Sequence, residues 1–238
     1  MTSITQNLQA VQHAIAQAAL AAERDPQKIK LLAVSKTFPA TAIREAYQAG
    51  QRLFGENYVQ EAVPKIEALS DLSIQWHFIG PIQSNKTRAI AKNFSWVHSV
   101  DSLKIAERLS AQRPDNLPPL NVCIQINTSG ELSKSGIHMG QVAELARAIA
   151  QLPRIKLRGL MTIPAFAASL EMQRIPFSQL REIKDSINTL SPCGAQGLTL
   201  DTLSMGMTHD LHAAVLEGAT MVRVGTGIFG ERNYFEGA

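Results

Sequence analysis

The chain has 238 residues, of which 45% are hydrophobic and 18% are charged, and its formal net charge is +3. It contains no apolar stretch near the roughly 20 residues needed to span a bilayer, and its basic residues are scattered, so a membrane protein and a nucleic-acid-binding protein are both poor interpretations. Cys123 and Cys193 form no CxxC pair and the first residues show no signal-peptide pattern, which favours a soluble globular protein of the cytosol.

An amphipathic helix comes first in the predicted order of elements. Ile4, Leu8, Val11 and Ile15 recur at helical spacing and predict a helix over residues 3–23. Eight short apolar runs follow and predict strands at residues 31–35, 52–57, 76–80, 96–100, 121–127, 157–163, 202–206 and 221–225. Helix-like stretches between them include residues 39–50, 102–112, 140–153, 177–190 and 209–218.

This alternation determines the fold class that we expect. Apolar strands that alternate with amphipathic helices are typical of a parallel sheet covered by helices. Eight such units predict an α/β fold, a single (β/α)8 TIM barrel with an extra N-terminal helix. An open, doubly wound sheet is the alternative. Because no Gly-, Pro- or Ser-rich linker interrupts the pattern, we expect residues 1–238 to form one domain.

Lys36 is the most informative polar residue at the end of a predicted strand. It lies two residues after Val34 and therefore on the same face, which directs its amine toward the mouth of the barrel. A partly desolvated amine has a lowered pKa and can attack an aldehyde to form an imine. An exposed structural lysine is the other interpretation of this position.

Small residues follow the last two predicted strands, as SMGMT at residues 204–208 and GTG at residues 225–227. Barrels commonly bind phosphate with these two loops and a short helix N-terminus, here near Ile228. The hydroxyls of Ser204 and Thr226 would add donors to the backbone N–H groups. The alternative is that the glycines only make tight turns.

Arg223 lies two residues before Gly225 and shares its face, so its side chain should lean toward the same cavity. It could contact a ligand or pair with an acid such as Glu56. An imine-forming lysine, a phosphate cradle and an arginine on one rim indicate either pyridoxal 5′-phosphate (PLP) or a sugar-phosphate Schiff base.

Seven segments in order carry a family resemblance: LLAVSKT (31–37), FGENYVQE (54–61), WHFIGPIQSNK (76–86), NTSGELSKSGI (127–137), GLMTI (159–163), LSMGMTHD (203–210) and MVRVGTGIFGER (221–232). Together they resemble the pyridoxal phosphate homeostasis proteins, which are similar in fold to the N-terminal barrel of alanine racemase. The resemblance implies that Lys36 carries PLP as a Schiff base, and that the Ser204 loop, Gly225 and Thr226 bind its phosphate.

The resemblance also implies that Arg223 faces the pyridine nitrogen and that Asn57 and Met161 line the ring pocket. A guanidinium cannot accept the ring proton, so the nitrogen should stay neutral and PLP should be a weaker electron sink. We therefore expect a PLP-binding protein of intracellular PLP (vitamin B6) homeostasis without strong catalytic activity. The alternatives are a PLP-dependent, racemase-like enzyme and a Schiff-base aldolase acting on sugar phosphates.

Alanine racemase uses a tyrosine from another domain of its dimer partner as a second base. In this chain only Tyr58 lies near the rim by its position in the sequence, whereas Tyr47 falls in a predicted helix and Tyr234 lies near the end of the chain. Lys86 and Lys134 lie in rim loops and could also meet a phosphate. The histidines form no metal-binding pattern, so we expect no metal site. We further expect a monomer, with PLP-requiring apo-enzymes as possible partners.

Overall fold

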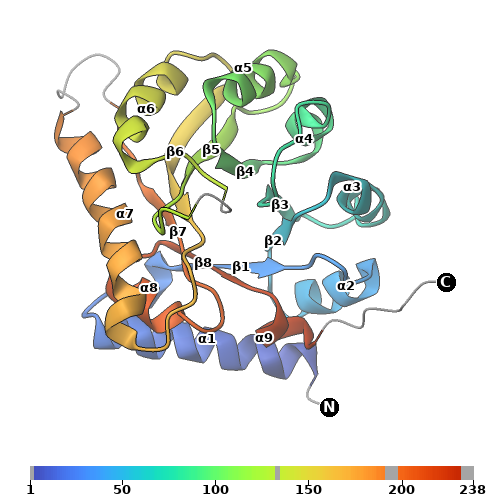
Figure 1. Cartoon of the computed structure of the whole chain (residues 1–238). Helices are drawn as coiled ribbons and strands as arrows, with labels where there is room; N and C mark the ends of the chain where they lie inside the picture. Colours follow the sequence, from blue (N-terminus) through green and yellow to red (C-terminus); the bar gives the residue numbers. More distant parts are fainter. Residues whose placement is uncertain (1–2, 132–134, 191–197, 232–238) are drawn as a thin grey trace.

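Eight parallel strands close into a barrel in sequence order in a computed structural model of the protein, which describes residues 3–131, 135–190 and 198–231 (Figure 1). The strands are β1 (Lys30–Val34), β2 (Leu53–Glu56), β3 (Gln75–Phe78), β4 (Trp96–Val100), β5 (Leu120–Ile126), β6 (Ile155–Thr162), β7 (Thr202–Ser204) and β8 (Met221–Val224). Lys134, Cys193 and Tyr234 lie outside the described residues.

The strands β1 and β8 close the ring, because Leu32 pairs with Arg223 and Ala33 with Val224 in parallel register. This pairing of the first strand with the last confirms the barrel and excludes the open, doubly wound sheet. Each predicted strand overlaps its observed counterpart. Among the described residues, no helix is long and apolar enough to cross a membrane.

Helices cover the outside of the barrel (Figure 1). They are α1 (Ile4–Ala21), α2 (Ala40–Gln48), α3 (Val59–Ala68), α4 (Thr87–Asn93), α5 (Leu103–Gln112), α6 (Val142–Ala150), α7 (Leu170–Leu190), α8 (Leu211–Leu216) and α9 (Thr226–Phe229), with short 3₁₀ turns η1 (Pro26–Lys28) and η2 (Met139–Gln141). The helices α3 and α4 were not among those predicted. The helix α7 begins seven residues before the predicted start, because Ser169 caps it by accepting a hydrogen bond from Met172 N (3.3 Å) and Pro176 does not interrupt it.

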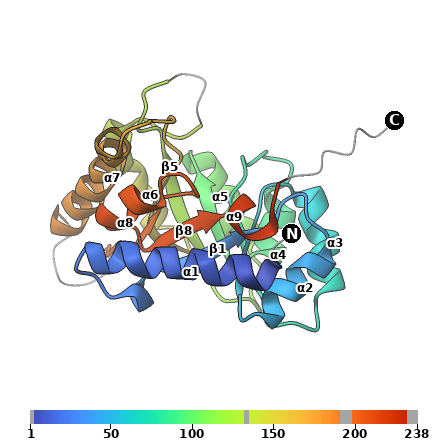
Figure 2. The same ribbon diagram turned by 90° about the horizontal axis from the view of Figure 1, so that it is seen from below.

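The extra N-terminal helix, α1, runs across the barrel beside β1 and β8 (Figure 2). It starts with a capping box between Ser3 and Gln6 and buries Leu8 and Ile15 against the main core. The Asn7 side chain donates to the Ile228 carbonyl of α9 at 2.9 Å. The helix α1 therefore holds α9, which begins directly after the carboxyl end of β8.

The barrel interior differs from the apolar layer between strands and helices. Trp96, Cys123 and Met161 form a small, separate buried cluster, and burial raises the pKa of the Cys123 thiol to about 12, as expected of an inert thiol. Buried polar side chains fill much of the remaining interior. His98 of β4 contacts Ser204 of β7, two strands that are not neighbours, so both side chains cross the inside of the ring.

Candidate functional site

Lys36, Asn57 and Gly225 meet at the carboxyl ends of β1, β2 and β8. Val34 pairs with Gly55 in parallel register, Lys36 follows the end of β1 by two residues, and Asn57 directly follows the end of β2. On the other side, a Cβ atom built on Gly225 would lie 3.2 Å from the Val34 carbonyl oxygen. The structure thus brings the predicted lysine, the predicted ring-pocket asparagine and the predicted phosphate-binding glycine to one rim.

The backbone immediately after Lys36 is strained. Thr37 has a φ of 70°, a left-handed conformation that is rare for a β-branched residue. Its N–H donates to Glu61 Oε1 of α3 at 2.5 Å, and Phe38 N donates to the Ser35 carbonyl at 3.1 Å, closing a tight turn. Strained residues of this kind persist where neighbours hold them, and they concentrate at functional sites.

A buried ion cluster holds the residue before Lys36. Lys65 of α3 donates to the Ser35 carbonyl (3.0 Å), to Glu56 (3.0 Å) and to Glu61 (2.5 Å). The Ser35 hydroxyl donates to Glu56 Oε1 at 2.7 Å, whereas Glu56 Oε2 is buried without a hydrogen-bond partner among the described residues. Burial raises the pKa of the Glu56 carboxyl against the lowering effect of Lys65. We call Ser35, Glu56, Glu61 and Lys65 the lysine clamp.

Arg223 lies at the floor of the mouth, and the residue is 3% exposed. Its Nη1 donates to the carbonyl (2.6 Å) and hydroxyl (2.9 Å) oxygens of Ser204, and its Nη2 donates to the Thr162 carbonyl (2.8 Å). The acid that sequence reasoning offered as a partner, Glu56, pairs with Lys65 instead. Burial lowers the pKa of Arg223 to about 10, so the guanidinium stays charged at neutral pH.

The Ser204 side chain lies inside the barrel. Its hydroxyl is fully buried, accepts from Arg223 and lies 2.7 Å from His98 Nδ1. A hydroxyl has one proton to donate, and here the Ser204 hydroxyl contacts Arg223 and His98, so phosphate binding by the Ser204 loop stays a prediction. Met161 is also fully buried, beside Trp96 and Cys123, and forms part of the floor.

The phosphate cradle predicted from the last two loops has suitable geometry at α9. The N–H groups of Ile228 and Phe229 both donate to the Gly225 carbonyl, so those of Thr226 and Gly227 precede the first helical hydrogen bonds. Gly225 and Thr226 are both partly or fully accessible. Unpaired N–H groups at a helix start bind anions such as phosphate.

The loop after β7 is the second wall of this cradle. Gly206 has a φ of 91°, and a Cβ there would lie 2.5 Å from the Ala214 Cβ, so the tight turn requires glycine. Asp210 Oδ1 accepts from Met207 N at 2.5 Å and fixes the turn. Thr208 is exposed and lies beside α9, because a Cβ added to Gly227 would lie 3.6 Å from the Thr208 methyl carbon Cγ2.

Two buried histidines were missed by sequence reasoning. His98 Nε2 lies 2.9 Å from His77 Nδ1, and both rings are fully buried in the barrel. Burial and the nearby Arg223 charge lower the pKa of His98 to about 3, and burial with the His98 charge lowers that of His77 well below its usual value. Both are therefore neutral. No sequence spacing signals this pair, because its members come from different strands.

The residues at the mouth suit PLP. Asn57 Oδ1 is buried without a hydrogen-bond partner among the described residues, and glycine at 225 leaves room beside the Val34 backbone. A lysine, a permanent cation and the N–H groups at the start of α9 match the aldehyde, the pyridine nitrogen and the phosphate of this cofactor. Of the other residues that the sequence placed near the rim, Tyr58 is 52% exposed and is the N-cap residue of α3, without a side-chain capping hydrogen bond to that helix. Lys86 is the N-cap residue of α4.

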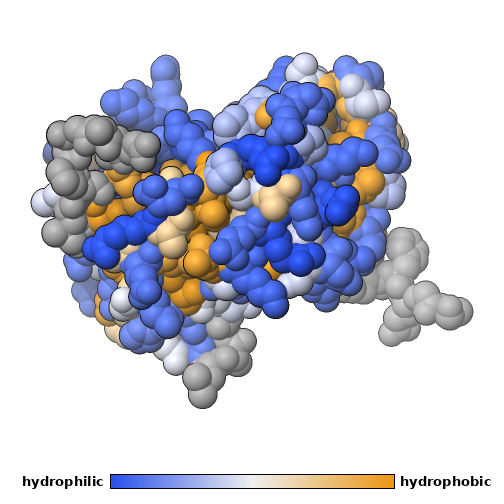
Figure 3. All heavy atoms as spheres, turned by 90° about the horizontal axis from the view of Figure 1, so that it is seen from above, coloured by the Kyte–Doolittle hydropathy of each residue, from blue (hydrophilic) through white to orange (hydrophobic). Residues whose placement is uncertain are grey.

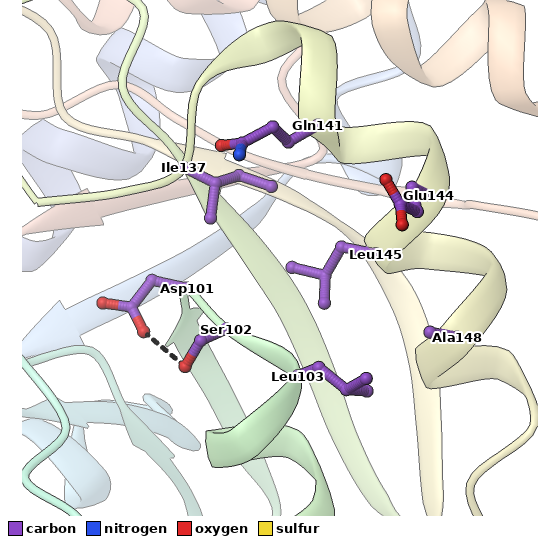
Figure 4. Close-up of a pocket in the computed structure, with 8 residues that line it drawn as sticks. All are labelled: Asp101, Ser102, Leu103, Ile137, Gln141, Glu144, Leu145 and Ala148. Carbon is purple, nitrogen blue, oxygen red and sulfur yellow. Dashed lines mark hydrogen bonds between the residues drawn. The ribbon is translucent and has the colours of Figure 1, made fainter.

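Hollows elsewhere on the surface contain none of the predicted site residues. One of about 290 Å³ lies between α5 and α6, where Leu103 and Leu145 face each other and Asp101 and Glu144 lie at its edges (Figure 4). A second, of about 400 Å³, separates α6 from α7. Seen from above, apolar side chains gather over one part of this face, beside an area of mainly polar side chains (Figure 3).

Similarity to known proteins agrees with this geometry. A family model described as alanine racemase, N-terminal domain, matches residues 6–233. A pyridoxal phosphate homeostasis protein from Pseudomonas aeruginosa is 57% identical over 98% of both chains. The chain belongs to this family. The family member from Escherichia coli K12 is 52% identical over 98% of this chain and 99% of its own, and the predicted resemblance is confirmed.

Solved structures similar to this member of the pyridoxal phosphate homeostasis family include PipY of Synechococcus elongatus with PLP bound. It is 38% identical, with a TM-score of 0.83 over 96% of this chain and 100% of that chain. An alanine racemase from Corynebacterium glutamicum is 20% identical, with a TM-score of 0.65, and this chain covers 62% of it. The racemase therefore shares the barrel fold and has additional chain outside it.

Proposed function

We propose that this protein binds PLP at the barrel mouth and serves intracellular PLP homeostasis. The observation that carries the proposal is the PLP-bound PipY structure, which is 38% identical over 96% of this chain. The names of the relatives from Pseudomonas aeruginosa and Escherichia coli support the same function.

The proposal assigns a role to each mouth residue. Lys36 would carry PLP as a Schiff base, with Asn57 beside the ring and Met161 in the floor beneath it. Gly225 and Thr226 at the start of α9 would bind the phosphate with their N–H groups. When bound, PLP supplies a reactive aldehyde and an electron-withdrawing ring.

The surroundings of the ring favour carriage of PLP over catalysis. Arg223 stays charged and can only donate a hydrogen bond, so it leaves the ring nitrogen unprotonated and the ring a weak electron sink. A racemase needs an acid or base on each face of the substrate. The tyrosine near the rim that could be considered for the second of these groups, Tyr58, lies at the start of α3 with half its surface exposed to solvent.

We propose the wider setting on the same basis. The chain would act in the cytoplasm as one barrel domain and as a monomer, and PLP-requiring apo-enzymes would receive PLP from it. Sedimentation of the purified protein with and without PLP would test the monomer, and a dimer would contradict it.

Absorbance and chemical trapping test the central proposal. PLP added to the purified protein should give an imine absorbance band, and borohydride should then fix the label on the peptide that contains Lys36. The Lys36→Ala variant should stay colourless, whereas the control Lys30→Ala, at the exposed start of the same strand, should bind normally. Labelling of another lysine would overturn the Lys36 assignment, and a protein that stays colourless with PLP would overturn the function.

A further inference from the structure

A chain of hydrogen bonds crosses the barrel from the mouth to its opposite end. It runs from Arg223 through Ser204 and His98 to His77, whose Nε2 lies 3.3 Å from Gln75 Oε1. Gln75 is exposed at the start of β3, whereas the other four members are buried. We call these five residues the interior polar chain.

The direction of these hydrogen bonds follows from Arg223, because a guanidinium only donates. Ser204 Oγ accepts from it and is free to donate its own proton to His98 Nδ1. A neutral His98 then carries its proton on Nε2 and donates to His77 Nδ1. His77 in turn donates from Nε2 to the side-chain oxygen Oε1 of Gln75, so the Ser204 hydroxyl and both histidine N–H groups each have an acceptor.

The opposite direction fits the contacts less well. A proton on His98 Nδ1 would make Ser204 Oγ accept two hydrogen bonds, from His98 and from Arg223, and its own proton would need a further acceptor. A doubly protonated His98 would add a second buried cation beside Arg223, which burial strongly disfavours. One proton arrangement of both rings is therefore consistent with the guanidinium.

We propose that His98 and His77 are positioning residues, which hold the Arg223 guanidinium toward the ring nitrogen of PLP through Ser204. The inference rests on the proposed PLP site and adds to it the residues that orient its cation. With His98 as acceptor, the Ser204 hydroxyl keeps its lone pairs turned to Arg223. The three hydrogen bonds that Arg223 donates to Ser204 and Thr162 then fix the plane of the guanidinium, which would leave its other N–H groups for the ring nitrogen.

The His98→Leu variant tests this role with two ligands, PLP and its deaza analogue, in which a C–H group replaces the ring nitrogen. Without an acceptor for Ser204, Arg223 loses its orientation, and PLP binding should weaken about tenfold, the loss typical of one charge-assisted hydrogen bond. The deaza analogue has no nitrogen for Arg223 to meet, so its affinity should not change between the two proteins. Its unchanged binding also shows that the variant is folded.

Two control variants sharpen the comparison. His98→Asn keeps an acceptor near the Nδ1 position and should restore most of the PLP affinity. Cys123→Ala removes a different interior side chain, outside the interior polar chain, and should affect both ligands equally if it affects either. Equal weakening of both ligands in His98→Leu would overturn the positioning role.

A second readout needs no ligand. In ¹⁵N NMR of the histidine-labelled protein, His77 and His98 should both be neutral with the proton on Nε2 near neutral pH, and Ser204→Ala should shift the His98 Nδ1 resonance. A proton on Nδ1 of His98 would overturn the proposed direction. If the wild-type protein bound neither PLP nor the analogue, the proposed function would fail, whereas normal binding with an Nδ1 proton would remove only this inference.

Discussion

At the scale of single residues, the site depends on places where a side chain has no room. Gly80 ends the β3 segment against the backbone of Asn57, and a Cβ added there would lie 2.1 Å from the Asn57 carbonyl oxygen. Neither backbone segment can move to make room for a Cβ atom without displacing the residues at the barrel mouth. Gly80 therefore places Asn57, although the two belong to different strand ends.

The Gly80→Ala variant should lower the free energy of unfolding by about 2–3 kcal/mol, as overpacking against backbone does. It should also weaken PLP binding, because Asn57 must shift. Chemical denaturation and a PLP titration measure the two effects. Gly140→Ala is the matched control, since its added Cβ would lie 3.6 Å from its nearest neighbour and should change neither quantity. Normal stability of Gly80→Ala would contradict the tight contact.

Residue-scale prediction from sequence succeeded where position along a strand decides the outcome. Lys36, Asn57, Arg223 and Gly225 lie at the mouth because strand ends and period-two alternation are visible in the sequence. It did not indicate the contact between the Ser204 hydroxyl and His98, 106 positions away in the chain. Contacts across the inside of a ring leave no local pattern.

At the scale of elements, the lysine clamp joins the β1–α2 turn to α3. Its one cation, Lys65, lies between the carboxylates of Glu56 and Glu61. The Lys65 side chain is 9% exposed. Removing that cation would leave Glu56 buried and without its counter-charge, which is costly in a protein interior.

The Lys65→Met variant should lose about 3–5 kcal/mol of unfolding free energy, and a second change, Glu56→Gln, should recover part of the loss because it removes the unpaired charge. Urea denaturation of the single and double variants measures this. The control is Arg44→Met, which breaks the exposed pair with Asp71 and should cost far less than the loss of the buried cation. Similar losses from the two single variants would contradict a buried clamp.

Element prediction was accurate for strands and incomplete for helices. The strands are short apolar runs with no competing interpretation, whereas α3 contains Pro64 and α4 has only seven residues. Proline and short length both weaken the helical signal. The Glu61 and Lys65 pair, four residues apart, was the signal that would have indicated α3.

At the scale of the whole molecule, the two buried imidazoles link stability to pH. The folded protein holds His77 and His98 neutral, whereas the unfolded chain takes up a proton on each below a pKa of 6.5. The unfolded state therefore binds more protons as pH falls from 6.5 toward 3, and stability decreases in that direction. Glu56, with its raised pKa, acts in the opposite direction.

His98→Asn should make the stability less dependent on pH. Each neutral buried imidazole contributes about 1.4 kcal/mol per pH unit to the slope, so the variant should lose about that much of the slope between roughly pH 4.5 and 6. Denaturation at several pH values measures it. His13→Asn, on the exposed face of α1, should leave the slope unchanged. An identical slope in wild type and His98→Asn would mean that His98 is protonated in the folded protein.

The pairing of β1 with β8 has a consequence for biosynthesis. Lys36 stands just after the first strand and Gly225 just after the last, so they become neighbours only when the ring closes. A growing polypeptide on the ribosome has the amine long before it has the anion-binding turn. The two halves of the proposed site can therefore act together only after almost the whole barrel has been synthesised. A ligand that contacts both halves would stabilise the pairing of β1 with β8.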